Sequence, residues 1–334
     1  YFLYIMCYNI FINLIDNIRG VMMKYISVND INSGIKKNAA EFVEKSENVY
    51  NNQLINAAEK IIKNLPEKSL VLISGPSGSG KTTSAMRIAG ILNNLGYQTF
   101  SISMDNYFRS NHSPGMPLDE NGDIDLESPL CLDINLFGEH MYKIQKCQPI
   151  DIPVFDFTTQ SRHEKTVHFQ RKENEIVIIE GIHALNPLVT GEIDRFTTKI
   201  YVSVRTRILS DGEYALHPKE IRLMRRLCRD TLFRGRSAEK VFEFLKSVSR
   251  GEELYIMPYK HLADMGIDTF IAYELSAYKE LIFPELLKIK DKMSDNRHYN
   301  EIMSVLSKLE PVSKDIISGT SLIREFVGGS EFEY

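Results

Sequence analysis

The sequence contains few cysteines, and their positions indicate neither a disulfide framework nor a zinc site. Four occur among 334 residues, at Cys7, Cys131, Cys147 and Cys228. None belongs to a CxxC pair or stands at a spacing typical of Cys/His metal ligands. We therefore expect a fold without disulfide bonds and a location in the reducing cytoplasm.

The sequence also lacks a strong charge of either sign and a long uninterrupted apolar run. Its 40 basic and 44 acidic residues leave a formal net charge of -4, which gives no general attraction to nucleic acid. The apolar stretch over residues 1–23 is too short and too often interrupted by polar residues for a membrane span. We expect neither nucleic acid nor a membrane as a partner.

The N-terminal stretch also lacks the cationic start and the cleavage site of a secretory signal. The codons for residues 19–21 (Arg-Gly-Val), just before Met22 and Met23, could form a purine-rich ribosome-binding sequence. We hypothesise that the natural start is Met22 or Met23 and that residues 1–22 are not native. A genuine hydrophobic helix is the alternative.

Short apolar runs alternate with helical patterns along the rest of the chain. The run LVLI at 70–73 is typical of a buried strand, and apolar residues at 85, 88, 89 and 92 mark one face of a following helix. Further strands are predicted at 99–103, 176–179, 199–204 and about 268–272. This order predicts an α/β fold with a mostly parallel sheet.

A glycine-rich turn joins the first strand to its helix. The segment GPSGSGKT at residues 75–82 satisfies the pattern GxxxxGK[ST], in which backbone N–H groups and a helix N-terminus surround phosphates. Lys81 would reach the β- and γ-phosphates, and Thr82 would hold Mg²⁺. The expected ATP contacts are Gly75, Ser77, Gly78, Ser79, Gly80, Lys81, Thr82 and Thr83.

Two carboxylates follow the next two predicted strands. Asp105 comes just after the strand at 99–103, and Glu180 directly follows the strand at 176–179. Because the carboxyl ends of parallel strands meet at one crevice, we expect Asp105 near the γ-phosphate as acceptor of a hydroxyl proton. Glu180 would lie beside Thr82 as a partner of Mg²⁺.

Arginines crowd the stretch RLMRRLCRDTLFRGR at residues 222–236. A cluster of this kind is ordinarily a solvated surface, but a polyphosphate needs arginines to neutralise its oxygens and exclude water. We therefore expect a closing lid in which Asp230 orients one of the arginines. The expected contacts are Arg225, Arg226 and Arg234 with ATP, Arg229 at the reacting phosphate and the acceptor, and Arg236 at the acceptor.

Taken together, the motifs resemble the uridine kinase and phosphoribulokinase family, closest to a bacterial uridine-kinase-like branch. The resemblance covers about residues 69–287. The quoted motifs are GPSGSGKT, MDNYF at 104–108, PVFDFTTQSR at 153–162, IIEGIHALNP at 178–187 and RRLCRDTLFRGRS at 225–237. The segments SRGEELYIMPY at 249–259 and SLIREFVGGSEF at 321–332 also recur in that branch.

The resemblance implies a P-loop fold with a five-stranded parallel sheet, a helical lid, and ATP and Mg²⁺ as cofactors. It implies phosphorylation of the 5'-hydroxyl of a pyrimidine nucleoside, with Asp105 as the base. The implied contacts of the nucleoside are Asp125 with the ribose hydroxyls, Tyr107 and Phe155 as walls of the pocket, and Gln160 and Arg162 nearby.

The chain departs from the family pattern at two positions of the expected acceptor pocket. Uridine kinases usually carry an aromatic residue before the ribose aspartate and a base-reading histidine, where this chain has Ile124 and Gln160. Alternatives are therefore a kinase for another small alcohol, such as pantothenate or a phosphosugar, and a nucleotide-binding regulatory or RNA-associated module. A pure switch has no use for Asp105, which argues against the module.

These observations predict a helical N-terminal extension over residues 1–66, a P-loop kinase domain over 67–292 and a helical C-terminal extension over 293–334. The lid is expected at about 205–262, and residues 109–123, rich in Pro, Gly, Asn and Asp, should form a mobile loop. The sequence leaves open the acceptor's identity, the preference between ATP and GTP, and whether the chain forms a homo-oligomer.

Overall fold

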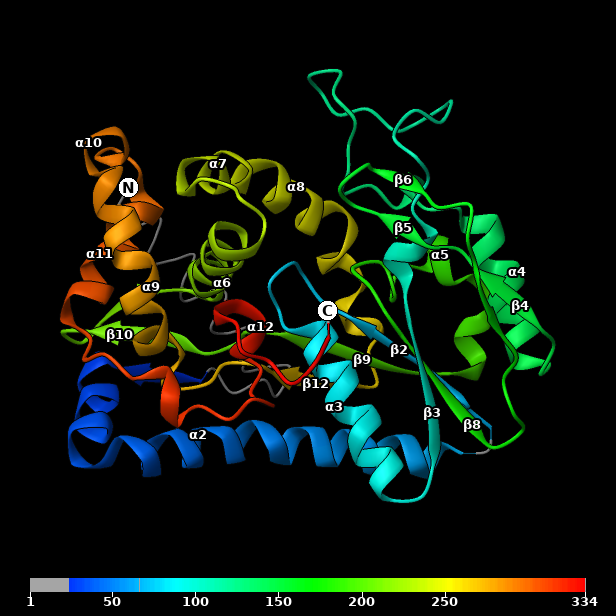
Figure 1. Ribbon diagram of the computed structural model, residues 1–334, viewed down its shortest axis with the longest axis horizontal. Coiled ribbons are helices and arrows are strands. Elements are labelled where there is room, and N and C mark those ends of the chain that lie inside the picture. The colour runs from blue at the N-terminus through cyan, green and yellow to red at the C-terminus, as the bar shows by residue number, and fades with distance from the viewer. Residues whose placement is uncertain (1–23, 66, 334) are drawn as a thin grey trace.

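The computed structural model describes residues 24–65 and 67–333, so the hypothesis about residues 1–22 lies outside the described chain. A parallel sheet of five strands, in the order β12-β9-β2-β8-β3, forms the centre of these residues (Figure 1). Its strands are β2 (Leu70–Ser74), β3 (Gln98–Ser103), β8 (Glu175–Glu180), β9 (Thr197–Ser203) and β12 (Met265–Asp268). The predicted α/β fold with a parallel five-stranded sheet is confirmed.

Helices cover both faces of this sheet because its strands are apolar on both sides. In β2, Val71 and Ile73 face one hydrophobic core, whereas Leu70 and Leu72 face the other. The first core contains residues of α2 (Val28–Asn64) and α3 (Lys81–Asn94), and the second contains residues of α4 (Ile134–Gln145). The sheet is therefore buried between two layers, as all-parallel sheets usually are.

The chain changes direction within the sheet beside β2. From β2 it moves to the edge strand β3 and back to β8, and it then crosses to β9 and β12 on the other side. Ligands of open α/β sheets bind at the carboxyl ends of the strands at such a switch point. The fold therefore places the loop after β2 at the expected ligand crevice.

The last strand of the sheet begins and ends earlier than the sequence predicts. The apolar pattern indicates a strand at about 268–272, but β12 ends at Asp268. The Asp268 carboxylate accepts hydrogen bonds from the backbone N–H groups of Arg205 and Phe270, at 2.9 and 3.1 Å. These bonds turn the chain, so that Phe270 and Ile271 are buried in the connection to α9 rather than in a strand.

Further helices follow the sheet strands in the second half of the chain. Three lie in the predicted lid region: α6 (Pro218–Phe233), α7 (Ala238–Glu243) and α8 (Leu245–Tyr255). The C-terminal helices are α9 (Glu274–Lys288), α10 (Lys290–Met293), α11 (Arg297–Lys308) and α12 (Arg324–Val327), and α5 (Pro187–Thr190) is a single turn after β8. In Figure 1 the helices α7 and α8 lie above the sheet, and α2 runs along beneath it.

Three small sheets complete the described structure. They comprise β1 (Tyr25–Ser27), β10 (Arg207–Ser210) and β11 (Glu213–Leu216); β4 (Ile150–Ile152) and β7 (Val167–Phe169); and β5 (Phe155–Asp156) and β6 (Ser161–Arg162). Short 3₁₀ turns occur at Met104–Tyr107, Pro129–Cys131, Gly191–Phe196, Met257–Leu262 and Lys314–Ile316. Within residues 24–65 and 67–333, no helix combines the length and the apolar character that a membrane crossing requires.

Candidate functional site

The loop between β2 and α3 has a backbone that only glycine can supply at several positions. Gly78 and Gly80 have φ angles of 72° and 80°, in the left-handed region that glycine adopts freely. A Cβ atom on Gly75 would lie 1.9 Å from the carbonyl oxygen of Val202. No side chain caps the N-terminus of α3 at Gly80. The loop therefore leaves helix N–H groups available for an anion, as the sequence predicts.

Lys81 is the first residue of α3, and its ammonium lies among several ionisable side chains. Its positive charge lowers the pKa values of Asp105 and Glu180 against the opposing effect of burial. It also acts on Glu127 and His183. The positive charge of Lys81 therefore acts on side chains from several segments: Asp105 after β3, Glu180 at the end of β8, and Glu127 and His183 in the connecting chain.

Asp105 and Glu180 come together at the carboxyl ends of two neighbouring strands. Ser103 of β3 stands opposite Glu180 of β8, and its hydroxyl donates a hydrogen bond of 2.8 Å to the Glu180 carboxylate. Burial raises the pKa of Glu180 to about 7, and repulsion from Asp105 contributes. Burial also raises the pKa of Asp105 above its ordinary value. Glu180 is buried and Asp105 is half-buried, and neighbouring carboxylates that repel each other favour a cation beside them.

Three of the predicted arginines surround one buried acid. Asp230 is 1% exposed, and its carboxylate lies 3.5 Å from Arg229, 3.4 Å from Arg234 and 3.3 Å from Arg236. The positive charges of Arg234 and Arg229 also reach Asp105, whose pKa they lower. The acid therefore holds the arginines together beside the pair of carboxylates, which agrees with its predicted orienting part.

Arg225 differs from its prediction as an ATP contact. Its guanidinium is fully buried and donates to the Glu274 carboxylate at 2.7 and 3.0 Å and to the Gly78 carbonyl at 3.1 Å. Since no part of the side chain is exposed, Arg225 braces the phosphate loop through its backbone instead of facing an open site. Arg226 is buried as well, at 6% exposure, within reach of the charges of Asp230 and Glu127.

Helix α8 connects the phosphate loop with the predicted acceptor residue Asp125. Glu252 of α8 pairs with both terminal nitrogens of Arg222, at 2.5 and 2.7 Å, and Arg222 also donates to the Ser77 carbonyl at 3.0 Å. On the same helix, Arg250 and Tyr255 each contact the Asp125 carboxylate at 2.9 Å. Asp125, which is 5% exposed, is therefore fixed by two side chains of α8.

Two further titratable groups lie behind Asp125. Burial raises the pKa of Glu127 to about 7, and repulsion from Glu252 and Asp125 adds to the shift. Burial lowers the pKa of His183 to about 4, so its imidazole is neutral at pH 7. Its ring lies edge-on to Tyr255, with 6.4 Å between the ring centroids.

The aromatic wall of the acceptor side differs from the expectation at one residue. Tyr107 is fully buried, and its hydroxyl bonds to His140 at 3.0 Å, so its ring belongs to the core. The aromatic cluster on this side instead combines the half-buried Phe155 with the half-buried Phe108 and the exposed Phe157, at centroid distances of 5.7 and 5.1 Å. The 3₁₀ turn at Met104–Tyr107 buries the ring of Tyr107 fully and leaves the ring of Phe108 half-buried against the same core.

Gln160 and Arg162 are engaged in bonds that hold this segment together. Gln160 has a positive φ of 52°, and its side-chain oxygen accepts a hydrogen bond from Asn111. Arg162 donates to the carbonyl oxygens of Tyr107 and Phe108, both at 2.8 Å, and to the Asp133 carboxylate at 3.1 Å. Their predicted contacts with an acceptor stay predictions.

Sequence reasoning missed several residues that the structure brings to this site. They are Glu127, Arg250, Glu252, Tyr255 and Glu325. Arg250, Glu252 and Tyr255 lie within a segment already quoted for the resemblance, so its pattern could have indicated them. Glu325 also lies within a quoted segment, at 321–332, whereas Glu127 belongs to none of the quoted motifs and the sequence offered no signal for it.

Comparisons with known proteins identify the family to which the chain belongs. A family model described as the phosphoribulokinase / uridine kinase family matches residues 70–275. A uridine kinase of Borreliella burgdorferi (strain ZS7) is 35% identical over 200 residues, which cover 59% of this chain and 85% of the relative. A uridine kinase of Lactobacillus helveticus (strain DPC 4571) is 32% identical over 202 residues, which cover 60% and 86%.

Solved structures were compared as well. A protein of Bacillus stearothermophilus described as a possible uridine kinase is 15% identical, with a TM-score of 0.44, over 65% of this chain and 98% of that chain. The region matched by the family model contains the phosphate loop, both carboxylates and the arginines of α6, whereas α12 lies outside it.

Proposed function

Because the chain belongs to the phosphoribulokinase / uridine kinase family of ATP-dependent kinases, we propose that it transfers the γ-phosphate of ATP to the 5'-hydroxyl of uridine or cytidine. The observation that carries this proposal is the position of Asp105. The carboxylate lies within the electrostatic reach of Lys81 on the phosphate loop and of Arg229 on α6. A base beside the phosphate-binding cations supports transfer to a hydroxyl.

In this reaction the acceptor oxygen forms a bond to the γ-phosphorus, and the bond from that phosphorus to the β,γ-bridging oxygen breaks. Asp105 takes the proton of the hydroxyl, and ADP leaves. Lys81 and Arg229 neutralise charge on the phosphate oxygens as it moves toward the leaving group. The N–H groups of the phosphate loop hold the rest of the triphosphate in place.

The residues of the site fit Mg²⁺ as the accompanying ion. Thr82 and Glu180 offer a hydroxyl and a carboxylate, the hard oxygen ligands that Mg²⁺ prefers. The raised pKa of Glu180 supports this assignment, because a carboxylate crowded by Asp105 gains most from a neighbouring cation. When bound, Mg²⁺ would neutralise part of the charge on the phosphate oxygens.

On the acceptor side, the fixed carboxylate of Asp125 supports recognition of a sugar. Arg250 and Tyr255 hold it in one orientation and leave it lone pairs for hydroxyl donors. The cluster of Phe108, Phe155 and Phe157 offers an apolar surface for a flat base. Curated relatives named uridine kinase add support for a pyrimidine nucleoside.

The test is a transfer assay with radiolabelled ATP over uridine, cytidine, adenosine, guanosine, pantothenate and a set of sugar phosphates. We expect a higher kcat/KM for uridine or cytidine than for the purine nucleosides. 5'-Deoxyuridine is the matched control, because it keeps the base and the ribose hydroxyls but lacks the accepting group. It should inhibit the reaction without being phosphorylated.

Two other results would replace the nucleoside proposal. Transfer to pantothenate or a phosphosugar, with no nucleoside above the background of ATP hydrolysis, would identify a kinase of another small alcohol. Tight ATP binding with transfer to none of these compounds would favour the regulatory module. Both alternatives leave the family membership unchanged.

A further inference from the structure

The C-terminal segment of the described chain lies against the phosphate loop. The Glu325 carboxylate of α12 accepts a hydrogen bond of 2.5 Å from the hydroxyl of Thr83, in the first turn of α3. Its other oxygen lies 3.7 Å from the guanidinium of Arg229. Leu322 packs on the loop at the same place, since a Cβ on Gly80 would meet its Cδ1 at 2.5 Å.

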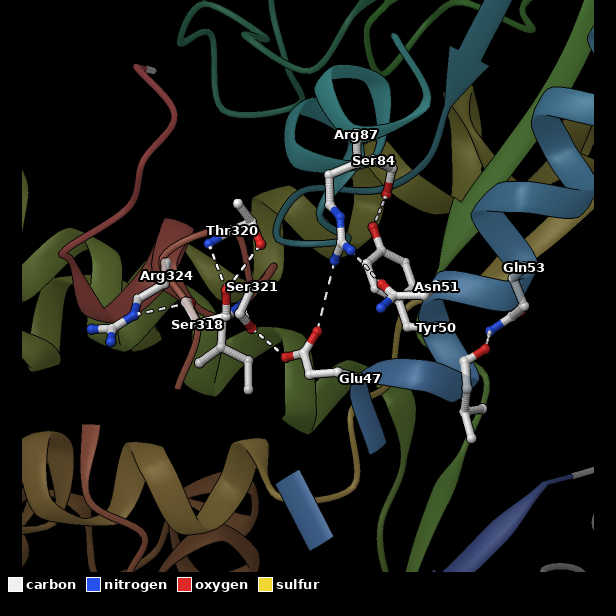
Figure 2. A network of polar contacts seen from close by, with 12 residues as sticks. Glu47, Tyr50, Asn51, Gln53, Ser84, Arg87, Ser318, Thr320, Ser321 and Arg324 are labelled. Carbon is white, nitrogen blue, oxygen red and sulfur yellow. Dashed lines mark hydrogen bonds and ion pairs between the residues drawn. The ribbon is translucent and has the colours of Figure 1, made fainter. Parts of the chain in front are cut away.

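This position is fixed by contacts with α2 and with the chain at residues 314–317. Ser321 donates a hydrogen bond of 2.5 Å to Glu47 of α2 (Figure 2). Glu47 also accepts a hydrogen bond of 2.6 Å from Tyr273. Arg324 donates to the carbonyl oxygens of Ile317 and Lys314 at 2.6 and 2.8 Å. The segment therefore has a defined seat beside α3, and Glu325 is directed into the site with 9% of its side chain exposed.

A carboxylate and a phosphate compete for the same donors. Thr83 follows the phosphate-loop motif directly, and Arg229 belongs to the lid arginines that reach Asp105. Glu325 engages both at once, as an oxygen pair of a nucleotide phosphate would. It also adds negative charge near Glu180, whose pKa it helps to raise. For a triphosphate to bind, Thr83 and Arg229 would first have to leave Glu325, and the negative charge of Glu325 would repel the phosphates.

We propose that Glu325 is an internal competitor of ATP, so that the C-terminal segment must release Thr83 and Arg229 before the donor nucleotide can bind. This inference rests on the donor half of the proposed function and is independent of the acceptor. The apparent affinity for ATP is then the intrinsic affinity reduced by the fraction of molecules in which the segment has opened. The segment thereby inhibits ATP binding, and we call this competition by Glu325 the brake.

The first experiment measures the binding of a non-hydrolysable ATP analogue by titration calorimetry. Glu325→Gln keeps the shape of the side chain and removes the competing charge, so Kd should fall by about tenfold if about one tenth of the wild-type molecules are open. Glu333→Gln, which removes an exposed carboxylate of the same segment, is the matched control and should leave Kd unchanged. Unchanged or weaker binding by Glu325→Gln would overturn the proposal, and weaker binding would make Glu325 a nucleotide ligand.

A second variant leaves Glu325 in place and loosens its seat. Ser321→Ala removes the bond to Glu47 and should also tighten binding of the analogue, by a smaller factor. Hydrogen exchange of residues 318–328 should become faster in the wild type when the analogue is added. Slower exchange would show the segment closing over the nucleotide and would refute a competitor.

Failure of the donor site itself would give a different result. Lys81→Ala should bind the analogue weakly whatever residue 325 is, because the phosphate loop has lost its cation. If wild type, Glu325→Gln and Lys81→Ala all fail to bind, the donor site and the brake are refuted together. If the analogue binds but no nucleoside is phosphorylated, the acceptor assignment fails and the brake stands.

Discussion

Asp105 stands between the cation of Lys81 and the second carboxylate of Glu180, and this setting determines the effect of its removal. Asp105→Asn keeps the shape and one acceptor oxygen but cannot take the proton. We expect kcat for transfer to fall by on the order of 10² or more, with the affinity for the ATP analogue retained. Calorimetry and steady-state transfer measure the two quantities.

Asp123→Asn, in the exposed loop nearby, is the control and should behave as the wild type. Loss of analogue binding in Asp105→Asn would make Asp105 a metal or structural residue. Undiminished transfer would place the base elsewhere. Basal hydrolysis of ATP should change much less than transfer, because water needs no proton acceptor fixed at the sugar.

Glu127 makes the stability of the protein depend on pH. Its pKa is raised to about 7 in the folded state, so the folded chain holds a proton that the unfolded chain has released. Because the folded state binds more protons between the two pKa values, this residue lowers stability as the pH rises from about 4.5 to about 7. Glu127→Gln removes that loss.

The measurement is urea unfolding of wild type and Glu127→Gln at pH 5 and pH 8. The urea midpoint of Glu127→Gln, measured relative to the wild type, should be higher at pH 8 than at pH 5. An equal difference at both pH values would contradict the raised pKa. Glu120→Gln, in the exposed loop, should show no pH-dependent difference.

Strand ends explain which site residues could be predicted from the sequence. Lys81, Asp105 and Glu180 each follow an apolar run, and parallel strands bring such positions together. Tyr107 could not be placed, because it and Phe108 are adjacent aromatics and only the backbone of a 3₁₀ turn decides which one is fully buried. Glu325 lies 242 residues from its partner Thr83, and no local pattern encodes so distant a contact.

At the scale of elements, the buried pair of Arg225 and Glu274 joins α6 to α9, and the bond of Arg225 to the Gly78 carbonyl joins α6 to the phosphate loop. Arg225→Ala leaves a buried carboxylate without its partner and should lower the free energy of unfolding by about 3–5 kcal/mol. Arg236→Ala changes an arginine that is 45% exposed and should cost less than about 1 kcal/mol. Urea unfolding of the two variants compares them directly.

If Arg225→Ala lowered the free energy of unfolding by less than about 1 kcal/mol, the buried pair would not be a stabilising interaction. A conservative partner variant, Glu274→Gln, should also be destabilised, since the guanidinium then lacks its charge partner. If Arg225 were an ATP contact alone, both variants would unfold like the wild type and only nucleotide binding would change.

The boundaries of elements were less predictable than their types. The edge strand β12 is displaced from its predicted position because Asp268 bonds two backbone N–H groups and ends it. An aspartate within an apolar run gives no such indication by itself. The arginine-rich stretch did predict a helix, but the inward direction of Arg225 depends on Glu274, which belongs to another helix.

For the whole molecule, the order of strands and helices follows from the alternation of apolar runs, and the sheet was predicted on that basis. The contacts that position the segments outside the sheet, such as α2 and the C-terminal segment, could not be predicted in the same way. Helix α2 extends over Val28–Asn64 with a kink at Asn38, and its Glu47 meets Ser321 from the far end of the described chain. Such pairs depend on the assembled fold rather than on local sequence.

Helix α8 has a consequence for the kinetics of the whole enzyme. Its eleven residues carry Glu252, which reaches the phosphate loop through Arg222, and also Arg250 and Tyr255, which hold Asp125. Because these three residues lie within six positions of one short helix, a shift of α8 changes both sets of contacts. The two substrates should therefore bind with synergy, each lowering the dissociation constant of the other by the same factor.

This synergy can be read from initial rates at varied concentrations of both substrates. The KM for the acceptor should fall as ATP approaches saturation in the wild type. Glu252→Gln weakens only the contact of α8 with the phosphate loop through Arg222, and the KM for the acceptor should then depend less on ATP. If the KM for the acceptor depended on ATP equally in both proteins, the contact of Glu252 with Arg222 would not couple the two substrate sites.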